Sequence, residues 1–272
     1  MKGSRLRQAL PALVLLFVSC GPPGETANPP AESKAALYSR GHQLYLTMHY
    51  DEAERDLMRA SAMDSAYGDP LVDLGSLWFD RAAKEEGARC LEDFRKSRDF
   101  LARAEELGYR DASAYDRLCE ICTDLEDARG FLKYAKRNAE HYPYDRQYYN
   151  LGVAYFGVDD WAGVVRSQRE ASEKFRESQY TGAFYRQMGR AYMKMDRDQT
   201  AERTLASGVQ AVDAAIAGLK KKGGGLRVEE LGRLHEDKIG MLLLLKRLHT
   251  TYRETEKLTQ VERQLKEAGY TK

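Results

Sequence analysis

The stretch that decides the fold runs from residue 186 to 205 and reads RQMGRAYMKMDRDQTAERTL. Its small and apolar residues recur every three or four positions, which is the period of an α-helix. The pattern is interrupted at Asp196-Arg197-Asp198, where short polar side chains offer N-cap acceptors for a second helix. The stretch therefore predicts two helices joined by a tight turn.

The same spacing recurs along the chain. In this stretch Gly189 is followed by Ala201 and then by Leu205. Three other stretches carry residues at matching positions: Gly41 with Ala53, Leu57 and Ala60; Gly152 with Val164, Gln168 and Ala171; and Gly75 with Leu74 and Trp78. A small residue on one helix lets the next helix approach closely, while larger residues fill the space against the neighbouring hairpin. We therefore predict a stack of similar hairpins.

These spacings resemble the tetratricopeptide repeat, whose pattern is L-G-x₂-Y, then A-x₃-F, then a second small residue. The best matches are residues 36–60, 149–165 and 186–205, and the resemblance covers about residues 33–210, with a weaker match over 226–268. It implies an all-α solenoid of about five to six helical hairpins. The repeats would occupy residues 34–210, and extended helices over 211–272 would form a degenerate repeat or a cap.

Two hairpins depart from the pattern. The second carries about ten extra residues, KEEGARCLED among them, before Leu101 and Ala104 resume the pattern. We expect a longer helix pair or a bulging loop to absorb them. The third has Cys119 in place of the glycine and Cys122 in place of the tyrosine.

The spacing Cys119-x-x-Cys122 also occurs in redox and metal sites. Such a role would need a second ligand pair or a strand before the motif, and the sequence contains neither. Packing is therefore the favoured interpretation, because a buried cysteine behaves as a small apolar residue. Whether Cys90 pairs with one of them is left open.

Residues 1–19 have the features of an export signal. Lys2, Arg5 and Arg7 precede an apolar run from Ala9 to Val18. A helix of ten residues is about 15 Å long, too short to cross a hydrocarbon core of about 30 Å. We therefore predict a cleaved signal peptide rather than a membrane span.

The run FVSCG (17–21) resembles the lipobox of bacterial lipoproteins, with Phe17 where leucine is usual. The resemblance implies acylation of the Cys20 sulfur and cleavage before this residue; plain secretion is the alternative. Residues 20–33 would then be a lipidated cysteine and a disordered Pro-rich tether. Gly21 after the cysteine favours the outer membrane, facing the periplasm, by the sorting rule of enteric bacteria.

Charge and motifs exclude several classes of function. A net charge of +1 over 272 residues argues against a polybasic nucleic-acid binder. His235-Glu236 begins like the zinc motif H-E-x-x-H, but Ile239 stands where the second histidine is required. The sequence contains neither a G-x-S-x-G elbow nor a G-x-x-x-x-G-K-[ST] loop. We therefore predict no catalytic residue, no metal site and no cofactor.

In tetratricopeptide solenoids the first helix of each hairpin lines a concave face that binds peptides or protein segments. By register, the resemblance assigns ten residues to this face: Tyr38, His42, Tyr45, Phe79, Tyr149, Val153, Phe156, Arg186, Arg190 and Met193. Aromatic and arginine side chains are typical of binding hot spots. Packing between repeats is the alternative role for each of them.

An export signal, a tether and a solenoid in one chain predict a lipid-anchored envelope scaffold that binds an envelope protein or peptide segment. This architecture is similar to pilotins of type IV pilus secretins and to the repeat lipoproteins of β-barrel assembly machines. The alternative is a ligand-handling accessory lipoprotein of a solute transporter, which would need an enclosed apolar pocket.

Overall fold

The structure is a computed structural model that describes residues 32–84, 87–222 and 228–270. Within these ranges the chain forms twelve α-helices and no β-strand. They are α1 (Lys34–Leu46), α2 (Tyr50–Met63), α3 (Asp69–Ala82), α4 (Ala88–Glu106), α5 (Ala112–Asp124), α6 (Ala128–His141), α7 (Asp145–Gly157), α8 (Trp161–Lys174), α9 (Thr181–Lys194), α10 (Asp198–Lys222), α11 (Val228–Thr251) and α12 (Thr255–Glu267). The all-α prediction is confirmed. The predicted signal peptide, Cys20 and the tether up to residue 31 lie outside the described residues.

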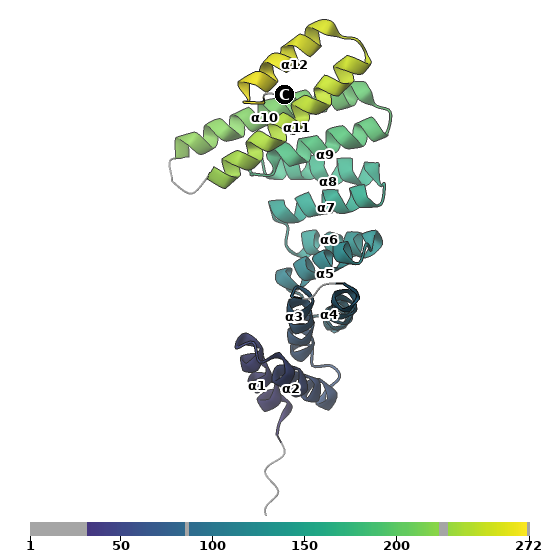
Figure 1. Cartoon of the computed structure of the whole chain (residues 1–272), viewed down its shortest axis with the longest axis vertical. Helices are drawn as coiled ribbons and strands as arrows, with labels where there is room; N and C mark the ends of the chain where they lie inside the picture. Colours follow the sequence, from purple (N-terminus) through teal and green to yellow (C-terminus); the bar gives the residue numbers. More distant parts are fainter. Residues whose placement is uncertain (1–31, 85–86, 223–227, 271–272) are drawn as a thin grey trace, which may run out of the picture.

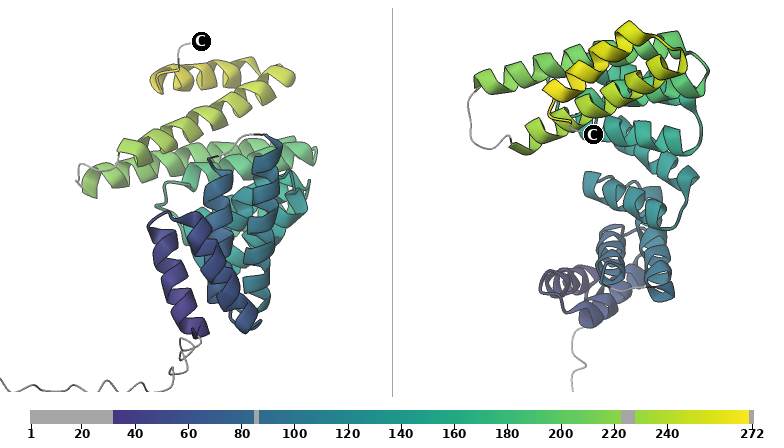
Figure 2. Two further views of the ribbon diagram at one scale, coloured as in Figure 1. Left: turned by 60° about the horizontal axis from the view of Figure 1, so that its bottom comes forward. Right: turned by 45° about the horizontal axis from the view of Figure 1, so that its top comes forward.

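The helices pair as six hairpins, and each hairpin packs on the next. Figure 1 shows the stack rising from α1 and α2 at one end to α12 at the other, and Figure 2 shows the same order from two further directions. Successive first helices touch each other, namely α1 with α3, α3 with α5, α7 with α9 and α9 with α11. In the described part of the chain no two successive second helices do so. The stack therefore curves with its first helices on the inner side, here called the first-helix face, and its second helices on the outer side, the second-helix face.

The joint between the third and fourth hairpins differs from the others. Here α7 packs on α6, but α5 and α7 make no backbone approach. An ion pair between Arg146 on α7 and Asp116 on α5, at 2.6 Å, connects the two first helices instead. The inner side of the stack is therefore joined at this point by side chains alone.

A small residue facing a larger one sets the distance between the two helices of a hairpin. A Cβ atom built on Gly41 would lie 2.8 Å from Leu57 Cγ, and Gly189 faces Leu205 even more closely. The two pairs have the same spacing in the sequence. In the third hairpin this register pairs Cys119 with Ala135, and both belong to one buried cluster. In this hairpin the larger residue of the pair, Cys119, lies on the first helix, and the smaller one, Ala135, lies on the second.

The second hairpin absorbs its extra residues in two places. Gly75 faces Leu101 across the hairpin, and an added Cβ would be 2.5 Å from Leu101 Cγ. The stretch from Gly75 to the start of α4 at Ala88 is longer than the stretch from Gly41 to the start of α2 at Tyr50. The other extra residues of this hairpin lengthen α4, which has 19 residues. Both expected solutions are thus used, a longer connection and a longer helix.

The turns of the hairpins repeat with the same register. Four non-glycine residues adopt positive φ values of 55° to 63°, each seven positions after the small residue of its hairpin: Met48, Glu126, Asp159 and Asp196. Non-glycine residues are uncommon in this region of backbone space. Their recurrence at one position shows that the hairpin imposes this turn on the chain.

The C-terminal helices form a sixth hairpin with the same turn. Arg253, between α11 and α12, has a φ of 57°. Its register places Lys246 opposite Glu262, and these side chains form an ion pair at 2.9 Å with both partly exposed. The contact between glycine and leucine has been replaced by a solvated one, as expected at the end of a solenoid. The predicted boundary between residues 210 and 211 falls inside α10, which continues to Lys222.

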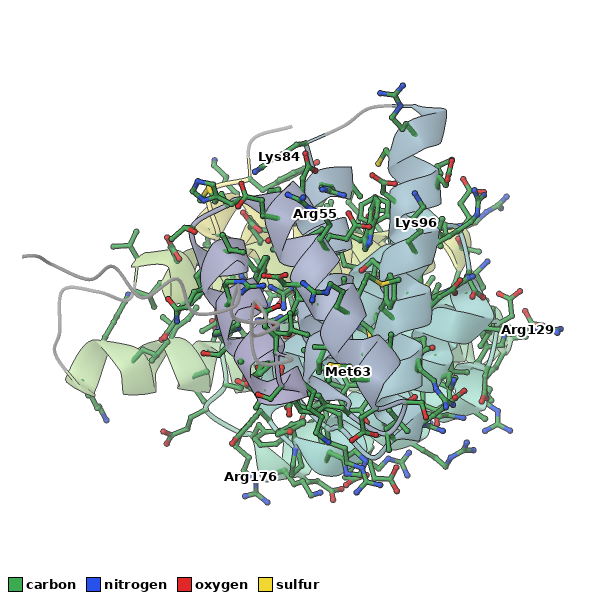
Figure 3. All side chains as sticks on the ribbon, turned by 90° about the horizontal axis from the view of Figure 1, so that it is seen from below. Arg55, Met63, Lys84, Lys96, Arg129 and Arg176 are labelled. Atoms are coloured by element: carbon green, nitrogen blue, oxygen red, sulfur yellow. The ribbon has the colours of Figure 1, made fainter. Side chains whose placement is uncertain are left out.

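The buried side chains form a series of clusters along the stack, the longest of which extends from Met188 to Leu265. The surface around these clusters carries many charged side chains. Figure 3 shows them at the N-terminal end of the molecule. None of the helices in the described ranges has the length and apolar content needed to span a bilayer.

The contact between the helices of the fifth hairpin can be tested with Ala201→Glu. Ala201 is 0% exposed, so the substitution buries an unpaired carboxylate and should lower the free energy of unfolding by about 3 kcal/mol or more. Urea denaturation followed by circular dichroism measures the change. The matched control is Ala206→Glu on the exposed side of α10, which should stay within about 0.5 kcal/mol of wild type. Equal effects of the two variants would contradict the repeat register.

Candidate functional site

The first helices are joined to one another by side-chain contacts along the first-helix face. Between α1 and α3, His42 Nδ1 lies 2.7 Å from an Asp73 carboxylate oxygen. The Tyr45 hydroxyl donates a hydrogen bond to Asp80 at 2.9 Å. Between α3 and α5, the Arg117 guanidinium lies 5.8 Å from the centre of the Phe79 ring.

The row continues through the C-terminal half of the stack. After the ion pair of Arg146 with Asp116, the guanidinium of Arg190 on α9 lies 4.4 Å from the ring centre of Phe156 on α7. Arg186 on α9 then pairs with Asp237 on α11 at 3.1 Å. Six of the ten residues predicted for the concave face therefore contact a neighbouring first helix: His42, Tyr45, Phe79, Phe156, Arg186 and Arg190.

The other four predicted residues differ in their surroundings. Tyr38 is half-buried with its ring centre 5.5 Å from that of Tyr67, and burial raises the pKa of its hydroxyl to about 12. Met193 packs against the C-terminal buried cluster. Tyr149 stacks on Tyr180 with ring centres 5.0 Å apart. Val153 is 37% exposed, which makes it an accessible apolar side chain on α7.

A hollow of about 460 Å³ lies where α7, α9 and α11 meet. The stacked rings of Tyr149 and Tyr180 form one side, and the Arg233 guanidinium lies 4.9 Å from the Tyr180 ring centre. Its lining also includes Arg186, Glu229, Gly232, Glu236 and Asp237. Stacked rings beside charged groups of both signs suit a polar peptide, whose planar amides and side chains can use both.

Asp237 in this hollow has a buried carboxyl group with a shifted pKa. The residue is 3% exposed, and this burial raises the pKa of its carboxyl to about 6, although Arg186 acts to lower it. One carboxylate oxygen pairs with Arg186, and the other has no hydrogen-bond partner among the described residues. Gly182, in the first turn of α9, has no room for a side chain because Asp237 packs directly against it.

The sequence missed most of the partner residues on this face, among them Asp73, Asp80, Asp116, Arg146 and Asp237. For the first four, the sequence did contain a signal. The repeat register places each of these charged residues on a first helix next to one that carries residues predicted for the concave face. Asp237 had none, because the sixth hairpin lacks the glycine that fixes the register elsewhere.

The two cysteines of the third hairpin are buried in its core. Burial raises the pKa of the Cys119 thiol to about 12 and that of Cys122 to about 11. Both are therefore protonated thiols at neutral pH, which are weak nucleophiles and weak metal ligands. Their packing in the buried cluster agrees with the favoured interpretation, and Cys90 lies half-buried against the same cluster.

A cluster at the C-terminal end has the composition of a metal site. Glu202, His249 and Glu254 bring one ligand atom each within 4.8 Å of the others. The Lys257 ammonium lies 2.8 Å from Glu202 and 2.9 Å from Glu254, and His249 Nδ1 is 2.7 Å from Glu254. The lysine thus neutralises the carboxylates, and the cluster ties α10, α11 and α12 together as an ion-pair network.

Comparison with known proteins defines the fold. No family model and no curated protein sequence matches the chain. Among solved structures it is similar to YrrB, described as a TPR protein with an unusual peptide-binding site, at 13% identity and a TM-score of 0.51, over 70% of this chain and 92% of that one. It is also similar to MamA, at 15% identity and a TM-score of 0.49, over 66% and 92%, and to MamA of Desulfovibrio magneticus RS-1, at 17% and 0.46, over 67% and 97%.

The chain therefore has the tetratricopeptide-repeat fold, and the resemblance seen in the sequence is confirmed at the level of the fold.

The environment of Asp237 predicts a pH dependence of stability. Its pKa is about 6 in the folded protein against an ordinary value of 3.8, so between these values the folded state binds more protons than the unfolded state. Stability should therefore rise as the pH falls through 6. Between pH 7 and pH 5, wild type should gain about 1 kcal/mol relative to Asp237→Asn.

Thermal or urea unfolding of both proteins at the two pH values measures this difference. Glu256→Gln removes the same charge from an exposed residue of α12 and should keep the wild-type response. An identical pH response of Asp237→Asn and wild type would show that this carboxyl titrates normally.

Proposed function

We propose that this chain is a membrane-anchored scaffold that binds a segment of another envelope protein along its first-helix face. The observation that carries the proposal is the hollow between α7, α9 and α11, with its stacked tyrosines and flanking arginines. Rigid aromatic rings and arginines are the side chains that most often dominate protein interfaces. YrrB, which shares the fold, is described as having a peptide-binding site.

The lining of the hollow favours a peptide over an apolar small molecule. Five charged side chains face it: Arg186, Glu229, Arg233, Glu236 and Asp237. Pockets for apolar ligands are lined predominantly by hydrophobic groups with few polar ones. The alternative of a solute-transport accessory protein is therefore the less favoured one, and a small molecule retained in native mass spectra would support it.

Binding rather than catalysis is supported by the state of the titratable groups. On the first-helix face they pair with one another, as His42 does with Asp73 and Arg186 with Asp237. In the core, Cys119 and Cys122 are protonated. Neither arrangement supplies an activated nucleophile beside a base.

The anchor is proposed from the sequence of the N-terminus. A lipid on Cys20 would hold the chain at the membrane, and residues 21–33 would act as a spacer of about 40 Å. The first helix begins directly after this spacer, at Lys34. We place the scaffold at the outer membrane, facing the periplasm, where it would assist assembly of an outer-membrane complex in a pilotin-like or barrel-assembly-like role.

The anchor is tested by Cys20→Ala. The variant should lose the lipid and move from the membrane fraction to the soluble fraction of cell extracts, because a signal peptide alone does not hold the mature chain. Immunoblotting of the separated fractions and metabolic labelling with a fatty acid measure both effects. Unchanged membrane association without label would contradict a lipid anchor and leave the binding surface untouched.

The binding surface is tested with a photoreactive amino acid at Val153, which is accessible on α7. Irradiation of cells should give a discrete crosslinked product that contains this chain and one envelope protein, because a bound segment lies against α7. The control places the same amino acid at Arg129, on the exposed start of α6. Products of equal yield at both positions, or none at Val153, would contradict binding at the first-helix face.

A further inference from the structure

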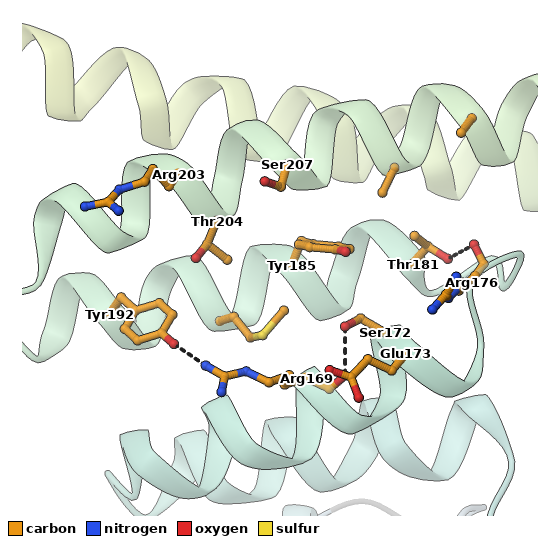
Figure 4. A pocket seen from close by; sticks show the side chains of 13 residues that line it. Arg169, Ser172, Glu173, Arg176, Thr181, Tyr185, Tyr192, Arg203, Thr204 and Ser207 are labelled. Atoms are coloured by element: carbon orange, nitrogen blue, oxygen red, sulfur yellow. Dashed lines mark hydrogen bonds between the residues drawn. The ribbon is translucent and has the colours of Figure 1, made fainter.

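A second groove lies on the second-helix face, between α8 and α10. Its volume is about 670 Å³, larger than that of the first-helix hollow. The floor is a single stripe of α9, formed by Thr181, Tyr185, Met188 and Tyr192, as Figure 4 shows. Because α8 and α10 do not touch each other, the stripe lies between them over roughly 16 Å of helix. Tyr185 is partly exposed there, whereas Thr181, Met188 and Tyr192 are buried.

The two walls of the groove differ in size and character. The α10 side presents small and hydroxyl side chains, namely Thr204, Ser207, Ala211 and Ala214, which keep the groove wide. The opposite side is built from Arg169, Ser172, Glu173 and Arg176, and Arg203 stands on the α10 side. The lining therefore contains three arginines and one glutamate.

These three arginines have no carboxylate partner among the described residues, in contrast to several other arginines of the chain. Arg81, Arg146 and Arg186 each form an ion pair with an aspartate or glutamate. In the described part of the molecule no such pair involves Arg169, Arg176 or Arg203. Arg169 donates to the Tyr192 hydroxyl at 2.8 Å, and Arg203 Nε donates to a backbone carbonyl of its own helix at 3.3 Å.

We propose that this groove binds an acidic, amphipathic segment of a partner protein. Carboxylates of the segment would pair with the three guanidinium groups, whose planar fork matches a carboxylate. Its apolar side chains would lie on the partly exposed ring of Tyr185, because a tyrosine ring packs well against apolar groups. The length of the floor corresponds to about 11 residues of a helix or about five of an extended strand.

This site is separate from the first-helix hollow. The residues of α9 that reach the hollow are Ala183 and Arg186, whereas the groove uses a different stripe of the same helix. One helix thus serves both surfaces, and both can be occupied at once. The scaffold would then connect two partners rather than hold one.

The proposal is tested by binding of a labelled peptide to the full-length chain in detergent. The probe is a fluorescein-labelled helical peptide of about 16 residues, with glutamates on one face and leucines on the other. The groove variant is Arg169→Glu, Arg176→Glu and Arg203→Glu together. The matched control reverses three exposed charges on α6, in Arg129→Glu, Lys133→Glu and Lys136→Glu; Figure 3 shows Arg129 and Arg176 on different sides of the molecule.

Fluorescence anisotropy should show that the groove variant binds the peptide at least about tenfold more weakly than wild type, and that the control variant changes the Kd by less than about twofold. Binding should also weaken with added salt. Should the triple variant unfold, as judged by circular dichroism, Ser207→Trp fills the groove without changing its charge and should reduce binding in the same way.

Several outcomes would overturn the proposal. Equal losses in both variants would mean that only general charge attraction was measured. Equal binding of a peptide with lysines in place of glutamates would exclude recognition of carboxylates. Binding of vesicles with about one third phosphatidylglycerol, lost in the groove variant while the peptide does not bind, would identify a lipid surface. Self-association lost in the groove variant, measured by light scattering, would identify a second copy.

Discussion

Two helices can approach each other only as closely as their facing side chains allow, and one such contact per hairpin determines the architecture of this chain. Leucine packs on the bare backbone of Gly41 and of Gly189. In the fourth hairpin the equivalent of leucine is Gln168, which is fully buried and donates its amide N–H to the Tyr148 carbonyl at 2.7 Å. The spacing of the hairpin is thus retained while the chemistry of the contact changes from apolar to polar. The hydrogen bond offsets the burial of the amide nitrogen, whereas the amide oxygen of Gln168 has no hydrogen-bond partner among the described residues.

The curvature that follows from this packing gives the two faces different electrostatics. On the inner side the first helices are close, and their charged side chains find partners across the gap, as Arg146 does with Asp116. On the outer side the second helices stand apart, and Arg169, Arg176 and Arg203 form no ion pair with a carboxylate of residues 32–84, 87–222 or 228–270. An inner face on which many charges are paired would recognise a ligand mainly by shape and stacking. The three arginines of the outer groove would attract an acidic segment by charge, which gives speed of association more than selectivity.

The hairpin register could be predicted because it rests on single residues at fixed distances, of which Gly41 and Gly189 are examples. Even the additional residues of the second hairpin were visible, since Leu101 resumes the pattern after them. The partner of each surface residue could not be predicted in the same way. Register places His42 on the first-helix face, but the angle between hairpins decides that it meets Asp73. The outer groove joins α8, α9 and α10 from two hairpins, so no single repeat contains its signature.

The joint between the third and fourth hairpins has a mechanical consequence. The inner sides of α5 and α7 are connected there by the partly exposed pair of Arg146 and Asp116, while α6 and α7 provide the apolar contact. Water and ions weaken an exposed pair far more than a buried apolar contact. Added salt should therefore loosen the inner connection at this joint, while the buried cluster that continues from the third hairpin to Leu151 and Ala154 of α7 still holds the two hairpins together.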